Sequence, residues 1–332
     1  MKSFTLLTLL GLSVATGFAA DMKPTVRKFA VVTLGNPRSI AVDLAGNLYV
    51  GDVEAGTVSK ITPAGAVSTL GAGGPAIHDP IGLAVDAAGA VYAADADANT
   101  VFKIAPGGVA AAYGKPAVGP SEGAFSTPTG VVLDAAGNAY ITDNGGNSIR
   151  KIAANGAISV FAGKSGESGS KDGAGDAARF TTPRGIAIDG KGNLYVADEG
   201  NSNIRKITPA GIVSTLAGTA AQSGSADGTG AAARFGAPRA LTADAAGNVF
   251  VADTDNHTIR KITPAGVVTT IAGKPGDSGK ADGPGAAARF SEPRSIAVDA
   301  AGTLYVADSG NSAVRQITPD GVVTTIAGAT KP

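Results

Sequence analysis

A short segment, SIAVDLAGNLYVGD in its first copy, occurs six times along the chain, and this repeat constrains the fold more than any other feature. Each copy carries an aspartate and, nine residues later, a second one. The first aspartates are Asp43, Asp86, Asp134, Asp189, Asp244 and Asp299, and the second are Asp52, Asp95, Asp143, Asp198, Asp253 and Asp308. Successive copies begin 43 to 55 residues apart, which excludes the shorter periods of ankyrin and tetratricopeptide repeats.

Each copy is predicted to form four short antiparallel strands joined as two hairpins. In the fourth copy, residues 186–188 and 194–196 flank a turn in which Gly192 can take a positive φ. Asp189 can accept hydrogen bonds from the amides of that turn. A second hairpin follows, and Pro209 fixes φ in its turn.

Six four-stranded units in one chain predict a six-bladed β-propeller, an all-β fold. A lone sheet of this size buries its face poorly, so each unit must stack on its neighbours, and closing the ring limits exposed sheet edges. An aromatic residue three positions before each second aspartate is expected to pack between adjacent sheets. These residues are Tyr49, Tyr92, Tyr140, Tyr195, Phe250 and Tyr305. A β-solenoid is the alternative fold, although solenoid coils are usually shorter and do not need two hairpins each.

The complete repeat, as it stands in residues 162–218, resembles the NHL repeat of six-bladed β-propellers, and the resemblance extends over residues 32–328. It implies a single propeller domain within residues 21–332. The expected blades span residues 37–71, 80–114, 128–163, 183–218, 238–273 and 293–328. The first two copies depart from the pattern, because Ser59 and Phe102 stand where later copies have arginine.

The first twenty residues have the composition of a signal peptide. Lys2 provides the positive start, residues 4–14 form an apolar stretch too short to span a bilayer, and residues 17–20 are a small-residue cleavage region. We therefore expect residues 1–20 to be removed on export to the periplasm or the exterior. No later run is long enough for a membrane helix.

Composition narrows the class of partner. The chain has 27 basic and 27 acidic residues, so it lacks the positive charge that nucleic-acid binding needs. It contains no cysteine, which removes thiol chemistry and disulfides. We expect a monomer that binds an unknown protein or a small anionic ligand.

Repetition separates structural from functional residues, because one active site does not need six copies of its residues. The twelve repeated aspartates are therefore expected to accept hydrogen bonds at turns and strand ends. Function is expected where the copies differ. The linkers before the first strands, the loops after the second aspartates and the long insertions 163–180, 218–235 and 273–290 all emerge on one face, the top face.

One such difference is an arc of arginines. Four copies carry arginine after the proline that opens the first strand, whereas the second and third copies carry Ile81 and Thr129. The four are Arg38, Arg184, Arg239 and Arg294. In a closed ring their blades are consecutive, so the guanidinium groups can bind an anion near the channel mouth. Glu199, Asp255 and His257 are further candidate binding residues on the same face. The alternative is that each arginine pairs with a carboxylate of a neighbouring blade.

The leading hypothesis is thus an exported, non-catalytic recognition or scaffold protein without a cofactor. The alternative is a metal-dependent propeller enzyme of the lyase or lactonase type, because related propellers hold zinc or calcium in the channel. The available ligands for such an ion are Glu54, Asp97, Glu199 and Asp255. No nucleophile elbow, phosphate loop or HExxH motif occurs in the sequence.

The insertions carry a recurrent Asp-Gly-x-Gly run that ends in Ala-Ala-Arg-Phe. We expect Asp172, Asp227 and Asp282 to cap a helical turn, and Phe180, Phe235 and Phe290 to pack against the blades. Arg179, Arg234 and Arg289 are expected to pair with a repeated aspartate.

A strand at residues 28–34 is expected to close the ring. Its sequence resembles that of the fourth strand in the last copy, residues 322–326. We predict that both strands pair at the outer edge of the sixth blade.

Overall fold

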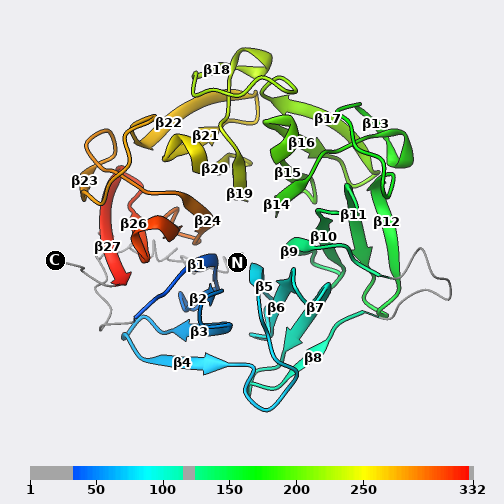
Figure 1. The fold of residues 1–332 in the computed structure, drawn as a ribbon, viewed down its shortest axis with the longest axis vertical. Coiled ribbons are helices and arrows are strands. Elements are labelled where there is room, and N and C mark those ends of the chain that lie inside the picture. The colour runs from blue at the N-terminus through cyan, green and yellow to red at the C-terminus, as the bar shows by residue number, and fades with distance from the viewer. Residues whose placement is uncertain (1–32, 115–123, 329–332) are drawn as a thin grey trace, which may run out of the picture.

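The computed structural model describes residues 33–114 and 124–328, and it is a six-bladed β-propeller (Figure 1). Six antiparallel sheets surround a central channel, and the first strand of each repeat lies innermost. The expected all-β, six-bladed propeller is confirmed, as are the hairpins within its blades. No helix long and apolar enough to cross a membrane is found among the described residues.

The first three blades each contain four strands. Blade 1 comprises β1 (Pro37–Val42), β2 (Leu48–Asp52), β3 (Thr57–Ile61) and β4 (Val67–Leu70). Blade 2 comprises β5 (Pro80–Val85), β6 (Val91–Asp95), β7 (Thr100–Ile104) and β8 (Ala110–Ala112). Blade 3 comprises β9 (Pro128–Leu133), β10 (Ala139–Asp143), β11 (Ser148–Ile152) and β12 (Ile158–Gly163).

Blades 4 to 6 each contain five strands, which corrects the expected four. Blade 4 comprises β13 (Gly173–Ala174), β14 (Pro183–Ile188), β15 (Leu194–Asp198), β16 (Asn203–Ile207) and β17 (Ile212–Ala217). Blade 5 comprises β18 (Gly228–Thr229), β19 (Pro238–Ala243), β20 (Val249–Asp253), β21 (Thr258–Ile262) and β22 (Val267–Gly273). Blade 6 comprises β23 (Gly283–Pro284), β24 (Pro293–Val298), β25 (Leu304–Asp308), β26 (Ala313–Ile317) and β27 (Val322–Gly328).

The extra strands come from the long insertions. Each insertion returns over the outside of the blade that follows it, so that β13 pairs with β17, β18 with β22 and β23 with β27. These two-residue strands cover part of an edge that would otherwise present unpaired backbone groups. Short 3-10 helices lie in the insertions before blades 4 and 5 and after the second strands of blades 4, 5 and 6. They are η1 (Gly175–Ala177), η2 (Glu199–Asn201), η3 (Gly230–Ala232), η4 (Thr254–Asn256) and η5 (Ser309–Asn311).

Local hydrogen bonds explain the hairpins. Asp189 accepts the backbone N–H groups of Lys191 and Asn193 at 2.9 Å, and Gly192 has φ +79°. In the second hairpin, the Thr208 carbonyl accepts the N–H of Gly211 at 2.8 Å. The predicted role of the repeated aspartates at turns is confirmed.

The core lies between blades. Tyr195 of blade 4, for example, packs with Leu241 and Val249 of blade 5 in one buried cluster. All six repeated aromatics are buried in this way, between 1% and 9% exposed. Tyr195 also donates its hydroxyl to Asp189 at 3.1 Å, a bond that Phe250 cannot make in blade 5. The expected packing of aromatics between sheets is confirmed.

Blades 6 and 1 close the ring by the same kind of packing. Tyr305 and Ile326 of blade 6 share a buried cluster with Ile40 and Leu48 of blade 1. Leu34, 4% exposed, belongs to this cluster too. Apart from residues 33 and 34, the predicted closing strand lies outside the described residues, as does the predicted signal peptide.

Candidate functional site

A β-bulge at the start of each innermost strand turns one side chain toward the channel mouth. In blade 1, Pro37 pairs with Asp52 but Ser39 pairs with Gly51, so that Arg38 is the extra residue. The same register shift occurs in the other five blades. The bulged positions are Arg38, Ile81, Thr129, Arg184, Arg239 and Arg294. A bulge changes the direction in which its side chain points. One residue per blade therefore determines which functional groups line the channel mouth.

The position after the bulge is restricted to a small residue. A Cβ on Gly185 would lie 2.6 Å from the Ala240 Cα and 2.7 Å from the Arg239 carbonyl oxygen. Gly130 is equally close to the Arg184 carbonyl oxygen. The inner strands therefore approach each other around the channel, and this spacing brings the bulged side chains together. A small residue stands after the bulged position in all six copies of the sequence, and this pattern could have predicted the close approach of the inner strands.

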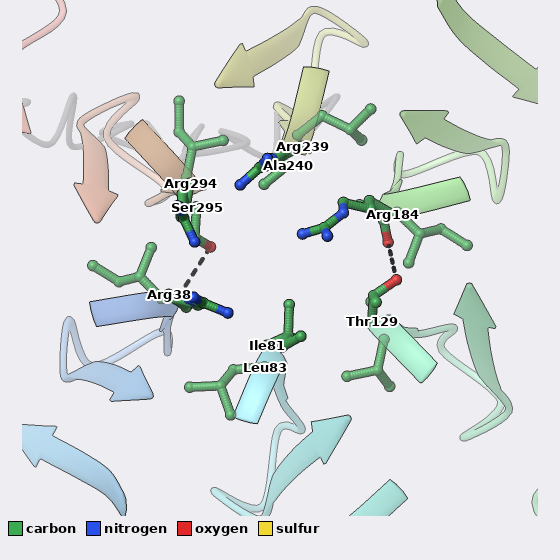
Figure 2. Close-up of a pocket in the computed structure, with 17 residues that line it drawn as sticks. Arg38, Ile81, Leu83, Thr129, Arg184, Arg239, Ala240, Arg294 and Ser295 are labelled. Atoms are coloured by element: carbon green, nitrogen blue, oxygen red, sulfur yellow. Dashed lines mark hydrogen bonds between the residues drawn. The ribbon is translucent and has the colours of Figure 1, made fainter. Parts of the chain in front are cut away.

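Figure 2 shows the four arginines converging on the channel mouth from blades 4, 5, 6 and 1. They line a cavity of about 60 Å³ together with Ile81 and Thr129. Their side chains are 19% to 29% exposed, so each guanidinium is partly desolvated and still reachable from solvent. The structure thus brings the predicted arginine arc together.

Glu199 bridges two of the arginines. Its Oε2 lies 2.6 Å from Nε of Arg184, and its Oε1 accepts a hydrogen bond from Nε of Arg239 at 3.0 Å. Because Glu199 belongs to blade 4 and Arg239 to blade 5, this carboxylate links the two neighbouring blades at the mouth. Glu199 was predicted as a site residue, and it contacts two of the four arginines.

The other two arginines have partners that sequence reasoning missed. Nη2 of Arg294 donates to Glu292 Oε2 at 2.6 Å, and Nη1 of Arg38 lies 4.0 Å from Asp79 Oδ1. Both carboxylates lie in the linkers that lead into first strands, next to the proline. Each carboxylate directly precedes the proline that opens the first strand, and this position in the sequence could have identified both as partners of the arginines.

Asp255 and His257 lie to the side of the arc. Asp255 is exposed on η4, and within residues 33–114 and 124–328 it makes no ion pair with an arginine. His257 Nδ1 accepts the backbone N–H of Glu292 at 3.1 Å. His257 therefore supports the carboxylate that pairs with Arg294, and Asp255 does not hold the arc.

The guanidinium groups repel one another. Burial, followed by the charge of Arg294, lowers the pKa of Arg38. Burial also lowers the pKa of Arg184, with Arg239 and Arg294 adding to the effect while Glu199 opposes it. An anion between these groups would relieve both the repulsion and the loss of hydration.

Several donors at the mouth have no protein acceptor. In the described part of the chain, no hydrogen bond uses the Nη atoms of Arg184, Arg239 or Arg38. Nε of Arg38 and of Arg294 is buried and also lacks a hydrogen-bond acceptor there. Thr129 differs, because its hydroxyl donates to the Arg184 carbonyl at 3.0 Å and serves the contact between blades 3 and 4.

The candidate metal ligands are not brought together. Glu54, Asp97 and Asp255 are exposed in three different blades, and Glu199 is engaged by two arginines. Among the described residues, no group of three or more histidine, aspartate or glutamate side chains has the arrangement of a metal site.

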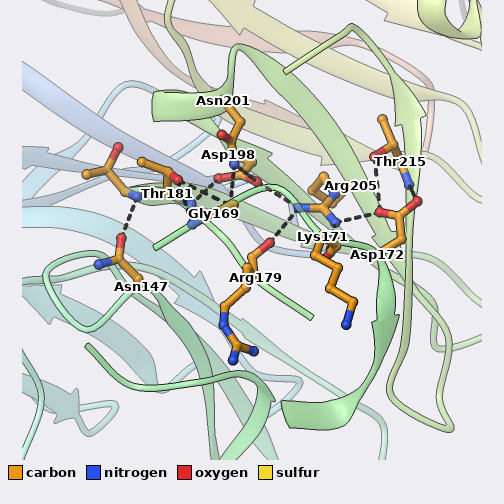
Figure 3. A network of polar contacts seen from close by, with 11 residues as sticks. Asn147, Gly169, Lys171, Asp172, Arg179, Thr181, Asp198, Asn201, Arg205 and Thr215 are labelled. Carbon is orange, nitrogen blue, oxygen red and sulfur yellow. Dashed lines mark hydrogen bonds and ion pairs between the residues drawn. The ribbon is translucent and has the colours of Figure 1, made fainter. Parts of the chain in front are cut away.

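A second arginine set is fully buried in the third strands, at the repeat position where the first two copies carry Ser59 and Phe102 and to which the sequence analysis assigned no role. Arg205 of β16 donates to Asp198 Oδ2 at 2.9 Å and to Asp172 Oδ1 at 2.5 Å (Figure 3). Its guanidinium lies 5.1 Å from the centre of the Phe180 ring. Burial raises the pKa of Asp198 to about 6, and the hydrogen bonds from Asn201 and Thr181 offset this only in part. Equivalent pairs occur at Asp143–Arg150, Asp253–Arg260 and Asp308–Arg315.

This buried set corrects two predictions about the insertions. Asp172 does not cap η1, which has no side-chain cap, but accepts bonds from Arg205 and Thr215 instead. Arg179 does not pair with a repeated aspartate, because Arg205 already occupies Asp198; it pairs with Glu167 at 2.7 Å. Arg289 pairs with Asp277, and Arg234 donates to Gln222. The predicted burial of Phe180, Phe235 and Phe290 is confirmed at 0% exposure.

Two family models match parts of the chain. The teneurin NHL domain matches residues 165–227, and the NHL repeat matches residues 290–317. Curated relatives include Protein SUPPRESSOR OF QUENCHING 1, chloroplastic, of Arabidopsis thaliana, 32% identical over 48% of this chain, and NHL repeat-containing protein 2 of Bos taurus, 30% identical over 47%. The chain spans only 16% and 23% of the length of these two relatives.

Solved structures share the fold at low sequence identity. A protein of unknown function from Bacteroides thetaiotaomicron has a TM-score of 0.69 and 22% identity, over 86% of this chain and 70% of that one. An auxiliary nutrient binding protein from Bacteroides ovatus has a TM-score of 0.67 and 19% identity, over 88% and 70%. Virginiamycin B lyase from Staphylococcus aureus has a TM-score of 0.60 and 18% identity, over 90% and 88%.

Proposed function

We propose that this protein, an NHL-repeat β-propeller, is an exported, non-catalytic recognition protein that binds an anionic group at the top-face mouth of its channel. The observation that carries the proposal is the convergence of four arginines on one cavity, with donors that have no hydrogen-bond acceptor among the described residues. The proposal of export rests on the signal-peptide composition of residues 1–20. A mature protein whose N-terminus follows residue 19 or 20 would support this proposal.

The chemistry of the mouth fits an anion. Guanidinium groups bind carboxylate, sulfate and phosphate oxygens through paired N–H donors. The three nearby carboxylates, on Asp79, Glu199 and Glu292, hold the arginines in place but leave one net positive charge. A cavity of about 60 Å³ has room for an anionic head group, since roughly 10–15 Å³ of such volume suffices for one water.

The relatives support binding in a general way only. Among the propellers that share the fold are auxiliary nutrient binding proteins from two Bacteroides species, alongside lyases and gluconolactonases. The absence of a gathered metal-ligand set among the described residues leads us to prefer binding as the proposal.

Replacing Arg184, Arg239 and Arg294 together by glutamine tests the proposal. We expect acetate and sulfate, measured by titration calorimetry, to bind the native protein and to lose detectable binding to the variant. The melting temperature should change little, because partly exposed ion pairs contribute only about 0 to 1 kcal/mol each.

The insertions provide a matched control. Replacing Arg179, Arg234 and Arg289 by glutamine removes three arginines from the same blades but away from the mouth. This control should bind anions as the native protein does. If the channel variant unfolds, the arginines are braces between blades; if it binds normally, the anion site lies elsewhere. Either result would overturn the proposal.

A further inference from the structure

The channel wall beneath the arginines is aliphatic. Side chains two residues apart on a strand face the same side, so each inner strand places a second side chain in the channel below the bulge. These side chains form an aliphatic ring of Ile40, Leu83, Val131, Ile186, Leu241 and Ile296. The same six residues also line a lower cavity of about 240 Å³, and Thr242 is the only one of its described lining residues with a polar side chain.

The arginine arc is open on one side, where Ile81 of blade 2 and Thr129 of blade 3 occupy the bulged positions. Figure 2 shows Ile81 facing the arginines across the mouth. A ligand held by the guanidinium groups would therefore contact hydrocarbon both across from the arc and beneath it.

Charge favours a ligand with a single negative charge. The four guanidinium groups pair with three carboxylates, those of Asp79, Glu199 and Glu292, so these paired groups together carry one net positive charge. A doubly charged anion would leave an excess negative charge in a partly desolvated site, which is costly.

We infer that the ligands of this site are aliphatic monocarboxylates, with the carboxylate held by the arginine arc and the alkyl chain against Ile81 and the aliphatic ring. This inference rests on the proposed function, because it assumes that the arginines bind an anion. It adds the chemical class of the ligand, which the arginines alone do not specify.

A chain-length series tests the inference. Acetate, butyrate and hexanoate are titrated into the native protein at fixed pH and salt, with sulfate for comparison. Burial of a methylene is expected to raise affinity by about threefold to fourfold. Hexanoate should therefore bind much more tightly than acetate, and all three carboxylates should bind more tightly than sulfate.

Two variants at one partly exposed position locate the alkyl contact. Ile81→Thr removes apolar surface from the mouth and should weaken hexanoate binding several-fold while leaving acetate nearly unchanged. Ile81→Arg extends the arc to a fifth blade and should shift the preference from hexanoate toward sulfate. Val160→Thr, on the outer strand β12, is the matched control and should change neither. Thermal melting checks that each variant is folded.

The outcomes distinguish the inference from the proposed function. If carboxylates bind with no dependence on chain length, or if sulfate binds more tightly, the inference is wrong while anion binding stands. If Ile81→Thr weakens acetate and hexanoate equally, the alkyl chain does not contact blade 2 and the inference is again wrong. If no anion binds at all, the proposed function fails as well.

Discussion

Two sets of arginines in blades 4 to 6 have opposite environments although their charge is the same. Arg205, Arg260 and Arg315 are fully buried against two aspartates each. Arg179, Arg234 and Arg289 lie in the insertions with exposed partners. A buried arginine has given up its hydration and depends on its protein acceptors, so the first set should matter for stability and the second should not.

Replacing Arg205 by methionine should lower the free energy of unfolding by about 3–5 kcal/mol, because Asp198 would remain buried without its cation. The matched replacement Arg179→Met, in the same blade, should cost about 1 kcal/mol or less. Denaturant unfolding followed by circular dichroism measures both. Equal losses in the two variants would contradict the assignment of Arg205 as the brace.

At the scale of the strand, the propeller depends on how closely the inner strands approach. The bulge in each first strand leaves one extra residue without a partner in the ladder, and the next residue then faces the backbone of the adjacent blade. That residue is serine, glycine or alanine in all six blades: Ser39, Gly82, Gly130, Gly185, Ala240 and Ser295. Where it is serine, the hydroxyl is used, as when Ser295 Oγ accepts the Ile40 N–H at 3.1 Å across blades 6 and 1.

Replacing Gly185 by alanine should destabilise the protein by about 1–3 kcal/mol, because the new Cβ would overlap the Ala240 backbone. Gly190→Ala is the control: no atom lies within 4 Å of its added Cβ, and other repeats carry alanine there. Thermal melting should show a loss for the first variant and almost none for the second. A tolerated Gly185→Ala would mean that the blades can separate without cost.

At the scale of the whole molecule, the two halves of the ring differ. Blades 4, 5 and 6 carry fifth strands over their outer edges and, with blade 1, supply the arginine arc. Blades 1 to 3 show four strands in the described part of the chain, and Val67 and Val160 on outer strands are 45% and 41% exposed. The ring closes where the two halves meet at blades 6 and 1, next to the buried Leu34.

Deleting residues 21–34 should lower the melting temperature, because Leu34 packs in the cluster that joins blades 6 and 1. The Leu34→Ala variant isolates that contact and should cost about 2–5 kcal/mol. Deleting residues 21–27 leaves the predicted closing strand intact and is the control. An unchanged melting curve after removal of residues 21–34 would show that the N-terminal segment has no part in closure.

The number of blades, the hairpins within them and the role of the repeated aspartates at turns could all be predicted from the sequence. These features depend on contacts between residues a few positions apart, such as Asp189 with Asn193, so local turn chemistry and strand periodicity suffice to predict them. The interblade position of Tyr195 was also predictable, because an aromatic that recurs in every sheet has only the neighbouring sheet to pack against.

The pairing of charged side chains, in contrast, depends on how distant parts of the chain fold together. Arg205 contacts Asp172 across 33 residues and Glu199 contacts Arg239 across 40, through an insertion that folds back and a ring that closes. Spacing along the chain does not encode these contacts, so Arg179 was assigned to the wrong aspartate. The channel mouth forms because the bulged residues of six strands, which are far apart in the sequence, line one cavity in the folded ring.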